Sequence, residues 1–272
     1  MNKLRITTLC IALFCMLGII ASANTAGAED NLDLAKTSQN PVGKLISVPF
    51  ENNLYLNAGP EEETDYALIL KPVVPVSLGG NWTMINRLIT PFISQGERGP
   101  GQGRIFGLGD SIYQGFFTPA KPGKVILGVG PQLGIPTGMD RATSDQWTLG
   151  PTVVVLTMPG NWVMGFLTSN VWNIGSGYND APNVNAFSFQ YFFNYNLKDG
   201  WYLTTTPTIT ADWNAEGDNV WTVPFGGGVG RVFKWGKQSM SITGKGFYNV
   251  ERPDNAPDWN LQLRIALLFP KK

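Results

Sequence analysis

The residues in this chain that could do chemistry are glycine-rich turns and clusters of acidic side chains. The segments GPGQGR at 99–104, GLGD at 107–110 and GGGVGR at 226–231 have the composition of phosphate-binding loops. Such a loop holds phosphate where a helix begins directly after the glycines, and no helical pattern follows any of the three segments. We therefore interpret these glycines as positions where barrel strands twist, bend and pack closely.

Acidic side chains gather in three places, and a pair of carboxylates is what a glycosidase needs. The clusters are Glu61, Glu62, Glu63 and Asp65; Asp212, Glu216 and Asp218; and Glu251, Asp254 and Asp258. The first and third lie largely in predicted loops, where carboxylates are ordinarily solvated. A calcium ion or divalent-bridged lipid headgroups are the alternatives. We favour solvated loops and predict no metal site and no cofactor.

Histidine is absent from the sequence, which excludes most common catalytic arrangements. Both cysteines, Cys10 and Cys15, lie in an N-terminal segment that we expect to be removed. The mature chain then lacks Ser-His-Asp and Cys-His nucleophiles and zinc sites built on nitrogen and sulfur ligands. Basic and acidic residues number 20 each, so nothing indicates nucleic-acid binding. We predict that the protein is not an enzyme and binds no nucleic acid.

The N-terminus has the order of a secretory signal peptide. A basic start, MNKLR, is followed by an apolar stretch from Leu9 to Ala21 and by the small residues AGA at 26–28. We expect cleavage after Ala28, although ASA at 21–23 allows an earlier cut. A membrane-anchoring helix is the weaker alternative, because the apolar stretch is short and contains Thr, Gly and Ser.

Extended segments with period-two alternation fill the rest of the chain, rich in Thr, Val, Ile and aromatic residues. Only NLDLAKTSQN at 31–40 could form a turn or two of helix. We predict twelve strands, at 45–57, 65–78, 82–95, 105–118, 124–138, 147–158, 162–174, 184–197, 201–213, 220–233, 238–251 and 259–269.

The connections between these strands alternate in length. Hairpin-length turns are GGN, AKPG, PGN, KDG and KWGK, whereas the intervening connections, such as AGPEEET and GSGYNDAPN, are longer and more polar. Short turns at one end, long loops at the other and an even strand number are typical of outer-membrane barrels. The fold class that we predict is all-β: a transmembrane antiparallel up-and-down β-barrel of about 12 strands.

Several predicted strands have one apolar and one polar face, with charged residues in mid-strand on the polar side. Because ionisable groups are costly when they face lipid, we expect the polar face to point inward. The strands at 82–95, 147–158, 162–174 and 220–233 alternate poorly and their faces stay unassigned. The predicted lumen-lining residues are Arg87, Asp110, Gln114, Gln132, Gln190, Asn194, Thr206, Lys245, Gln262 and Arg264. They could line a solute path, or they could only fill and hydrate the lumen.

Tryptophan occurs near the ends of strands and never in the middle. At strand ends on both sides, these rings are placed for the two aromatic belts of a membrane barrel. The predicted belt residues are Trp82, Trp147, Trp162, Trp172, Trp201, Trp213, Trp221 and Trp259.

Three stretches carry a resemblance to a known family: LAKTSQNPVGKLISVPFENN at 34–53, GPGQGRIFGLGD at 99–110 and YNVERPDNAPDWNLQLRIALLFPK at 248–271. The sequence resembles the bacterial outer-membrane proteins grouped as "MetA-pathway of phenol degradation", whose members also carry the label neuromedin U. The resemblance implies an outer-membrane barrel that acts as a transporter or channel, linked to uptake of aromatic compounds. It supplies no catalytic residues.

These observations together predict a signal peptide over 1–28, an N-terminal periplasmic segment over 29–44 and an outer-membrane barrel over 45–272. We expect a narrow, partly obstructed lumen that passes small solutes, aromatic or apolar compounds included; a non-conducting barrel that displays its loops is the alternative. The expected partners are outer-membrane lipid and lipopolysaccharide, the barrel-assembly machinery and a small-molecule solute. The sequence does not give the oligomeric state.

Overall fold

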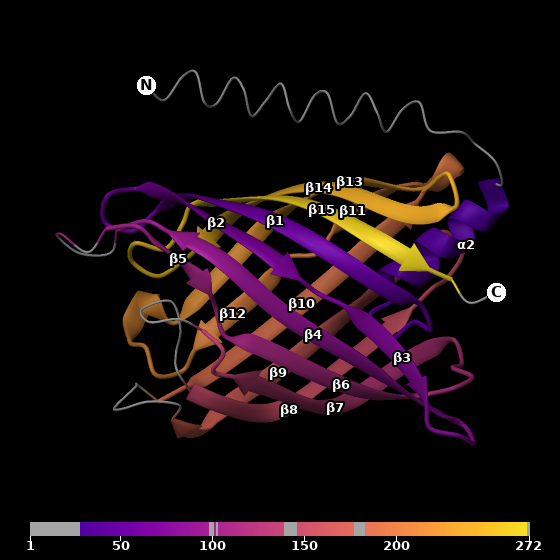
Figure 1. The fold of residues 1–272 in the computed structure, drawn as a ribbon, viewed down its shortest axis with the longest axis horizontal. Helices are drawn as coiled ribbons and strands as arrows, with labels where there is room; N and C mark the ends of the chain where they lie inside the picture. The colour runs from indigo at the N-terminus through magenta and orange to yellow at the C-terminus, as the bar shows by residue number, and fades with distance from the viewer. Residues whose placement is uncertain (1–27, 98–100, 102, 139–145, 177–182, 271–272) are drawn as a thin grey trace.

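The computed structural model describes residues 28–97, 101, 103–138, 146–176 and 183–270 (Figure 1). The predicted signal-peptide cleavage site and parts of three long loops lie outside or at the edge of these ranges. The elements are α2 (Ala28–Gln39), β1 (Ile46–Ala58), β2 (Glu63–Leu70), β3 (Val73–Ser77), β4 (Trp82–Gln95), β5 (Ile105–Leu108), β6 (Ser111–Pro119), β7 (Val125–Ile135), β8 (Gln146–Thr157), β9 (Trp162–Ser176), β10 (Asn185–Asn196), η1 (Lys198–Gly200), β11 (Trp201–Thr205), β12 (Thr208–Asp212), η2 (Gly217–Asn219), β13 (Trp221–Trp235), β14 (Gln238–Glu251) and β15 (Trp259–Phe269).

The strands form one closed antiparallel barrel of 12 strands, as the sequence predicts. The barrel closes where β1 pairs with β15, from Ile46 opposite Phe269 to Leu56 opposite Trp259. Three of the predicted strands are each interrupted once, and each appears as two segments: β2 and β3, β5 and β6, and β11 and β12. Pro72 and Pro207 occupy two of these breaks, because proline has no N–H to donate to the neighbouring strand.

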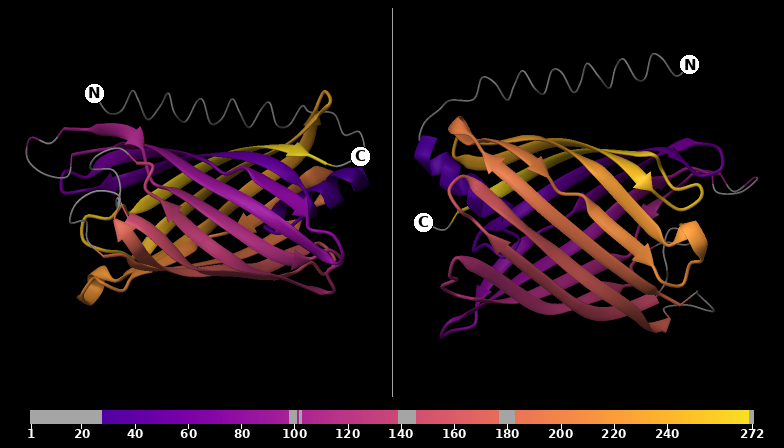
Figure 2. Two further views of the ribbon diagram at one scale, coloured as in Figure 1. Left: turned by 60° about the horizontal axis from the view of Figure 1, so that its bottom comes forward. Right: turned by 180° about the vertical axis from the view of Figure 1, so that it is seen from behind.

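Short turns lie at one end of the barrel and long loops at the other (Figures 1 and 2). We call these the short-turn end and the long-loop end. The short-turn end holds the β3–β4, β6–β7, β8–β9, β10–β11 and β13–β14 connections. Gly79 and Gly80, with φ of 82° and 56°, make the β3–β4 turn in a backbone region that other residues rarely adopt. The last strand, β15, also ends at this end, at Phe269.

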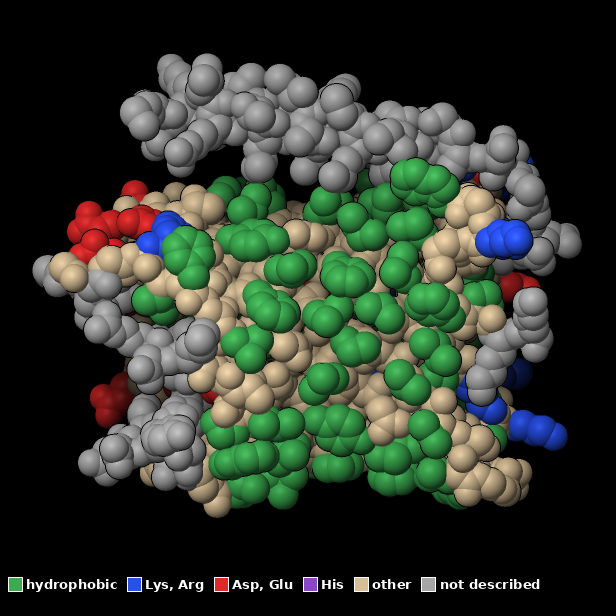
Figure 3. All heavy atoms as spheres, in the orientation of Figure 1, with side chains coloured by type: hydrophobic (Ala, Val, Ile, Leu, Met, Phe, Trp, Pro, Cys, Tyr) green, Lys and Arg blue, Asp and Glu red, His purple; other side chains and the backbone are tan. Residues whose placement is uncertain are grey.

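The outside of the barrel is apolar between its two ends. Hydrophobic side chains cover the visible wall, whereas charged side chains gather towards the ends (Figure 3). β15 shows the alternation behind this: Trp259, Leu261 and Phe269 are exposed, whereas Ala266 and Leu268 on the other face are buried. Within the described residues, no helix has the length and hydropathy to cross a membrane.

Residues 28–45, the N-terminal segment, lie at the short-turn end of the barrel (Figure 2), where Ala35, Val42 and Leu45 are buried against the inner wall. α2 carries Lys36 in its last turn, where a positive charge suits the helix dipole. Its end precedes Pro41, and the Asn40 side chain accepts a hydrogen bond from the Val42 N–H at 2.9 Å. Lys36 Nζ donates to the Gly160 carbonyl and Lys44 Nζ to the Ala120 carbonyl, both at 2.7 Å. The segment is thus tied to two of the short turns.

Two buried apolar clusters join the N-terminal segment to the barrel wall. Val42 packs with the first, whose wall residues are Ile85, Phe116, Ile126, Val154, Leu156, Val163, Leu167 and Phe192. Ala35 and Leu45 pack with the second, formed by Tyr202, Val232, Ala266 and Leu268. The inner face of the wall is therefore apolar at the short-turn end, and the N-terminal segment covers it.

Substitution of Leu263 by arginine tests which face meets lipid. Leu263 lies in mid-β15, one residue from the inward Gln262 and Arg264. An arginine facing the middle of a bilayer costs a membrane barrel about 2–4 kcal/mol, so L263R should lower the free energy of unfolding by that amount in lipid vesicles. The control is Asn260→Arg, which points into the cavity and should cost much less. Equal losses for the two variants would contradict the assignment of faces.

Candidate functional site

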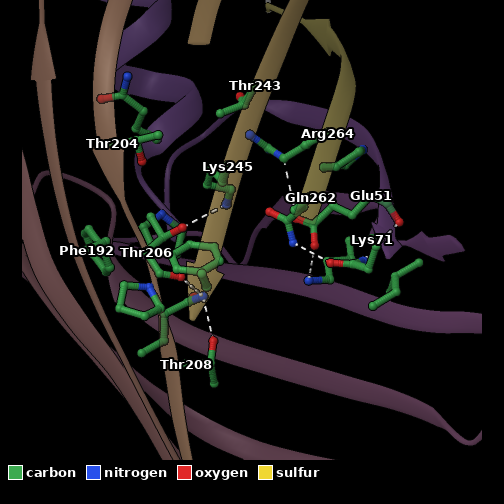
Figure 4. Close-up of a pocket in the computed structure, with 18 of the residues that line it drawn as sticks. Glu51, Lys71, Phe192, Thr204, Thr206, Thr208, Thr243, Lys245, Gln262 and Arg264 are labelled. Carbon is green, nitrogen blue, oxygen red and sulfur yellow. Dashed lines mark hydrogen bonds and ion pairs between the residues drawn. The ribbon is translucent and has the colours of Figure 1, made fainter. Parts of the chain in front are cut away.

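The inside of the barrel contains a cavity of about 560 Å³. The N-terminal segment, from Thr37 to Leu45, bounds it towards the short-turn end, and Asn249, Ala256 and Pro257 line it towards the long-loop end. Hydroxyl and amide side chains make up much of the wall, from β10 to β12 and from β14 to β1 (Figure 4). The cavity wall therefore carries many polar side chains, in contrast to the apolar inner wall beneath the N-terminal segment.

Glu51 lies at the centre of the charged part of the cavity wall. Its Oε2 accepts a hydrogen bond from Lys71 Nζ at 2.5 Å, and its Oε1 lies 3.7 Å from Arg264 Nε. Glu51 and Arg264 are direct cross-strand neighbours of β1 and β15, and Lys71 follows the end of β2. Opposite charges on adjacent strands attract at this spacing, so the sheet register itself places the carboxylate between two cations.

A row of polar side chains lies beside Glu51, two residues further along the same strands. Lys245 of β14 is opposite Gln262 of β15, which is opposite Asn53 of β1. Gln262 Nε2 donates to Asn53 Oδ1 at 2.9 Å, and Lys245 Nζ donates to Thr206 Oγ1 at 2.8 Å (Figure 4). Lys245 thereby reaches towards the wall at the β11–β12 break.

Arg87 of β4 is the remaining charged residue that lines the cavity. Its Nε and Nη1 atoms are shielded from solvent, and neither has a hydrogen-bond partner in the described part of the chain. Unsatisfied buried donors are costly, and those of a charged group especially so. The guanidinium group is therefore the least satisfied polar group of this wall.

The ten residues predicted to line the lumen fall into three places. Seven of them line the cavity: Arg87, Gln190, Asn194, Thr206, Lys245, Gln262 and Arg264. Gln114 and Gln132 are buried outside it, where Gln114 Nε2 donates to Gln132 Oε1 at 2.6 Å. Asp110 lies in the break between β5 and β6, not in mid-strand, and its carboxylate accepts the Gly138 N–H at 3.2 Å.

Glu51 and Lys71 also line the cavity, and the sequence reasoning did not select them. The sequence contains a pattern that could have identified them, because both are charged residues inside predicted strands, at 45–57 and 65–78. The rule that charged groups in mid-strand face away from lipid applies to them as it does to Arg264. Their mutual pairing across β1 and the β2–β3 break depends on register, which the sequence did not supply.

The eight predicted belt tryptophans lie close to strand ends, and seven are exposed on the surface. Trp162 contacts Tyr195 at the short-turn end, with ring centroids 4.8 Å apart. Trp213 and Trp221 contact each other edge-on at 5.4 Å at the long-loop end. The eighth, Trp201, is half-buried, and the Arg231 guanidinium lies over its ring at 5.2 Å.

The acidic clusters lie at the long-loop end, where parts of them form ion pairs. Glu63 pairs with Arg104, and Asp258 pairs with Arg252. In the described ranges, no group of three or more His, Cys, Asp or Glu side chains is arranged to hold a metal ion. The glycines of GGGVGR lie within β13, where a Cβ at Gly228 would come within 1.9 Å of the Gly244 carbonyl oxygen.

Solved structures with this fold include two outer-membrane barrels. The COG4313 outer membrane channel from Pseudomonas putida F1 is 18% identical, with a TM-score of 0.61 over 85% of this chain and 97% of that one. The NanC porin is 11% identical, with a TM-score of 0.52 over 83% of this chain and 100% of that one. No family model matches the sequence, and no curated protein matches it. At these identities the likeness concerns the fold.

Proposed function

We propose that this protein is a bacterial outer-membrane channel through which small solutes pass passively. The observation that carries the proposal is a polar cavity inside a closed barrel whose outer wall is apolar. Side chains lining such a cavity set which solutes pass. The two structural neighbours are described as an outer membrane channel and a porin, which supports the same reading. The protein is not an enzyme on this proposal, and it uses no cofactor.

The orientation follows from the two ends of the barrel. Short turns face the periplasm in outer-membrane barrels and long loops face outward. Once residues 1–28 are removed, the N-terminal segment begins at Glu29 and lies at the periplasmic end of the barrel, and the tryptophans near both ends contact lipid headgroups. Outer-membrane lipid, lipopolysaccharide and the barrel-assembly machinery are the partners of such a barrel.

The solutes are small, because the cavity is narrow and the N-terminal segment bounds one end of it. Aromatic or apolar compounds are among those that we propose, on the family resemblance of the sequence. Phe192 and Phe247 are aromatic side chains of the cavity lining that such a solute would contact.

Single-channel recording and liposome swelling with the purified protein test the channel. Current steps in a planar bilayer, or swelling with a small sugar or a small aromatic compound, are the expected results. If both solutes fail to pass and no current flows, the channel proposal is wrong. The second candidate, a non-conducting barrel that displays its long loops, would then hold. The N-terminal segment inside the short-turn end is the observation that favours this candidate.

Membrane insertion has a separate test on a gel. Outer-membrane barrels usually stay folded in SDS until they are boiled, because every strand is hydrogen-bonded on both sides. We expect the unboiled protein to migrate faster than the boiled protein. Identical migration would count against a membrane barrel, whatever the conductance.

A further inference from the structure

The charges that face the cavity are unbalanced. Among the described residues that line it, the charged ones are Glu51, Lys71, Arg87, Lys245 and Arg264. Four cations and one carboxylate give a formal charge of +3, although the whole chain has 20 basic and 20 acidic residues. A passage lined by charge of one sign concentrates mobile ions of the other sign.

The single carboxylate does not neutralise the cluster. Glu51 accepts Lys71 at 2.5 Å and lies 3.7 Å from Arg264, so two cations share one anion. Lys245 contacts a neutral hydroxyl, and Arg87 Nε and Nη1 contact no acceptor in the described residues. Four cations held on one wall repel one another, and an anion between them would relieve that repulsion.

The cluster also has the geometry of a site. Its residues come from the neighbouring strands β14, β15, β1 and β4 and from the β2–β3 break, so they share one side of the barrel. Thr206, Thr208 and Phe192 lie on the side facing them (Figure 4). A bound solute would thus meet cations on one side and hydroxyl groups beside an aromatic ring on the other.

We propose that this cluster is an anion-binding site, and that the solutes it takes are small organic molecules bearing an oxyanion, a carboxylate or a phosphate ester. The planar guanidinium of Arg87 lines the cavity and supplies charge and N–H donors that either group can accept. Lys245 and Arg264 add charge, and the hydroxyl groups across the cavity hydrogen-bond the rest of the solute. The inference deepens the proposed channel function, because it names the class of solute.

Calorimetry on the full chain in detergent micelles tests binding without requiring conduction. The probes are succinate, glycerol 3-phosphate and neutral glycerol, and at least one of the two anions should bind more tightly than glycerol.

Three variants test which charges matter. R87Q should weaken anion binding about tenfold, the effect of losing one charge-assisted hydrogen bond. E51Q should instead tighten it about threefold, the effect of one unit charge about 6 Å away in water-like surroundings. K124Q, in the exposed β6–β7 turn, should change nothing.

Opposite signs for R87Q and E51Q distinguish charge from a structural role, since a misfolded cavity would lose affinity in both variants. Reversal potentials in a potassium chloride gradient give the second readout, with chloride favoured over potassium. If anions bind but no current flows, the proposed channel function is wrong and the anion-binding site still stands. If the current favours potassium over chloride, or if glycerol binds as tightly as both anions, the anion-binding site is wrong. The proposed channel function would still stand.

Discussion

Removal of residues 29–45 from the mature protein is expected to raise the single-channel conductance several-fold. The N-terminal segment bounds the cavity at the short-turn end, and its Val42, Ala35 and Leu45 side chains fill space between opposite walls. Current through a pore is limited by its narrowest part, so removing the obstruction should increase the current. The measurement is planar-bilayer recording of the shortened and full-length proteins under the same salt.

A milder variant tests the same idea if the shortened protein fails to fold. Lys36→Ala with Lys44→Ala removes the hydrogen bonds to Gly160 and Ala120 but keeps the apolar contacts. We expect more frequent openings with it, at the conductance of the shortened protein. The matched control is Lys121→Ala, in the same turn as Ala120. If the shortened protein folds and conducts no better than the full chain, solutes pass beside the segment without displacing it.

Replacement of Gly130 by valine is expected to abolish the folded barrel. A Cβ at this position in β7 would lie 1.7 Å from the carbonyl oxygen of Gly115 in β6. The obstacle is backbone, which moves only if the two strands separate, so the cost should exceed the ~3 kcal/mol typical of severe overpacking. The readout is the fast-migrating band of the unboiled protein on SDS gels, which G130V should lack.

Gly244→Val is the control for this experiment. Gly244 also lies within a strand, β14, but a Cβ there has no neighbour within 4 Å. This variant should fold as the parent does, because the Cβ of the added apolar side chain would lie in open space. A folded G130V barrel would mean that the β6–β7 pairing tolerates separation at this point.

The strands were predictable where one face is apolar and the other polar. β15 and β10 have this pattern, and their inward Gln262, Arg264 and Asn194 line the cavity. The strands whose faces stayed unassigned are β4, β8, β9 and β13. Each of these supplies an apolar inward residue to a cluster beneath the N-terminal segment, such as Ile85, Val154, Val163 and Val232. Their alternation is weak because both faces are apolar there.

The cavity itself was less predictable than the barrel. Because charged groups are costly in lipid, the sequence predicts that Arg87, Lys245 and Arg264 face inward. The pattern within one strand does not show which side chains of the adjacent strands they contact. The pairing of Glu51 with Lys71 depends on where β1 ends and β2 returns. Gln114 and Gln132 pair with each other instead of facing the cavity, again through cross-strand register.

The position of the N-terminal segment has a consequence for the order of folding. The segment is synthesised before every strand, yet the residues that it packs on extend to Ala266 and Leu268, next to the C-terminus. The surface that Ala35 and Leu45 pack on is therefore incomplete until the last hairpin is in place and β15 has met β1. Contacts between residues so far apart in sequence form slowly, since the intervening chain must first be ordered. A segment made before every strand is thus the last to complete its native contacts.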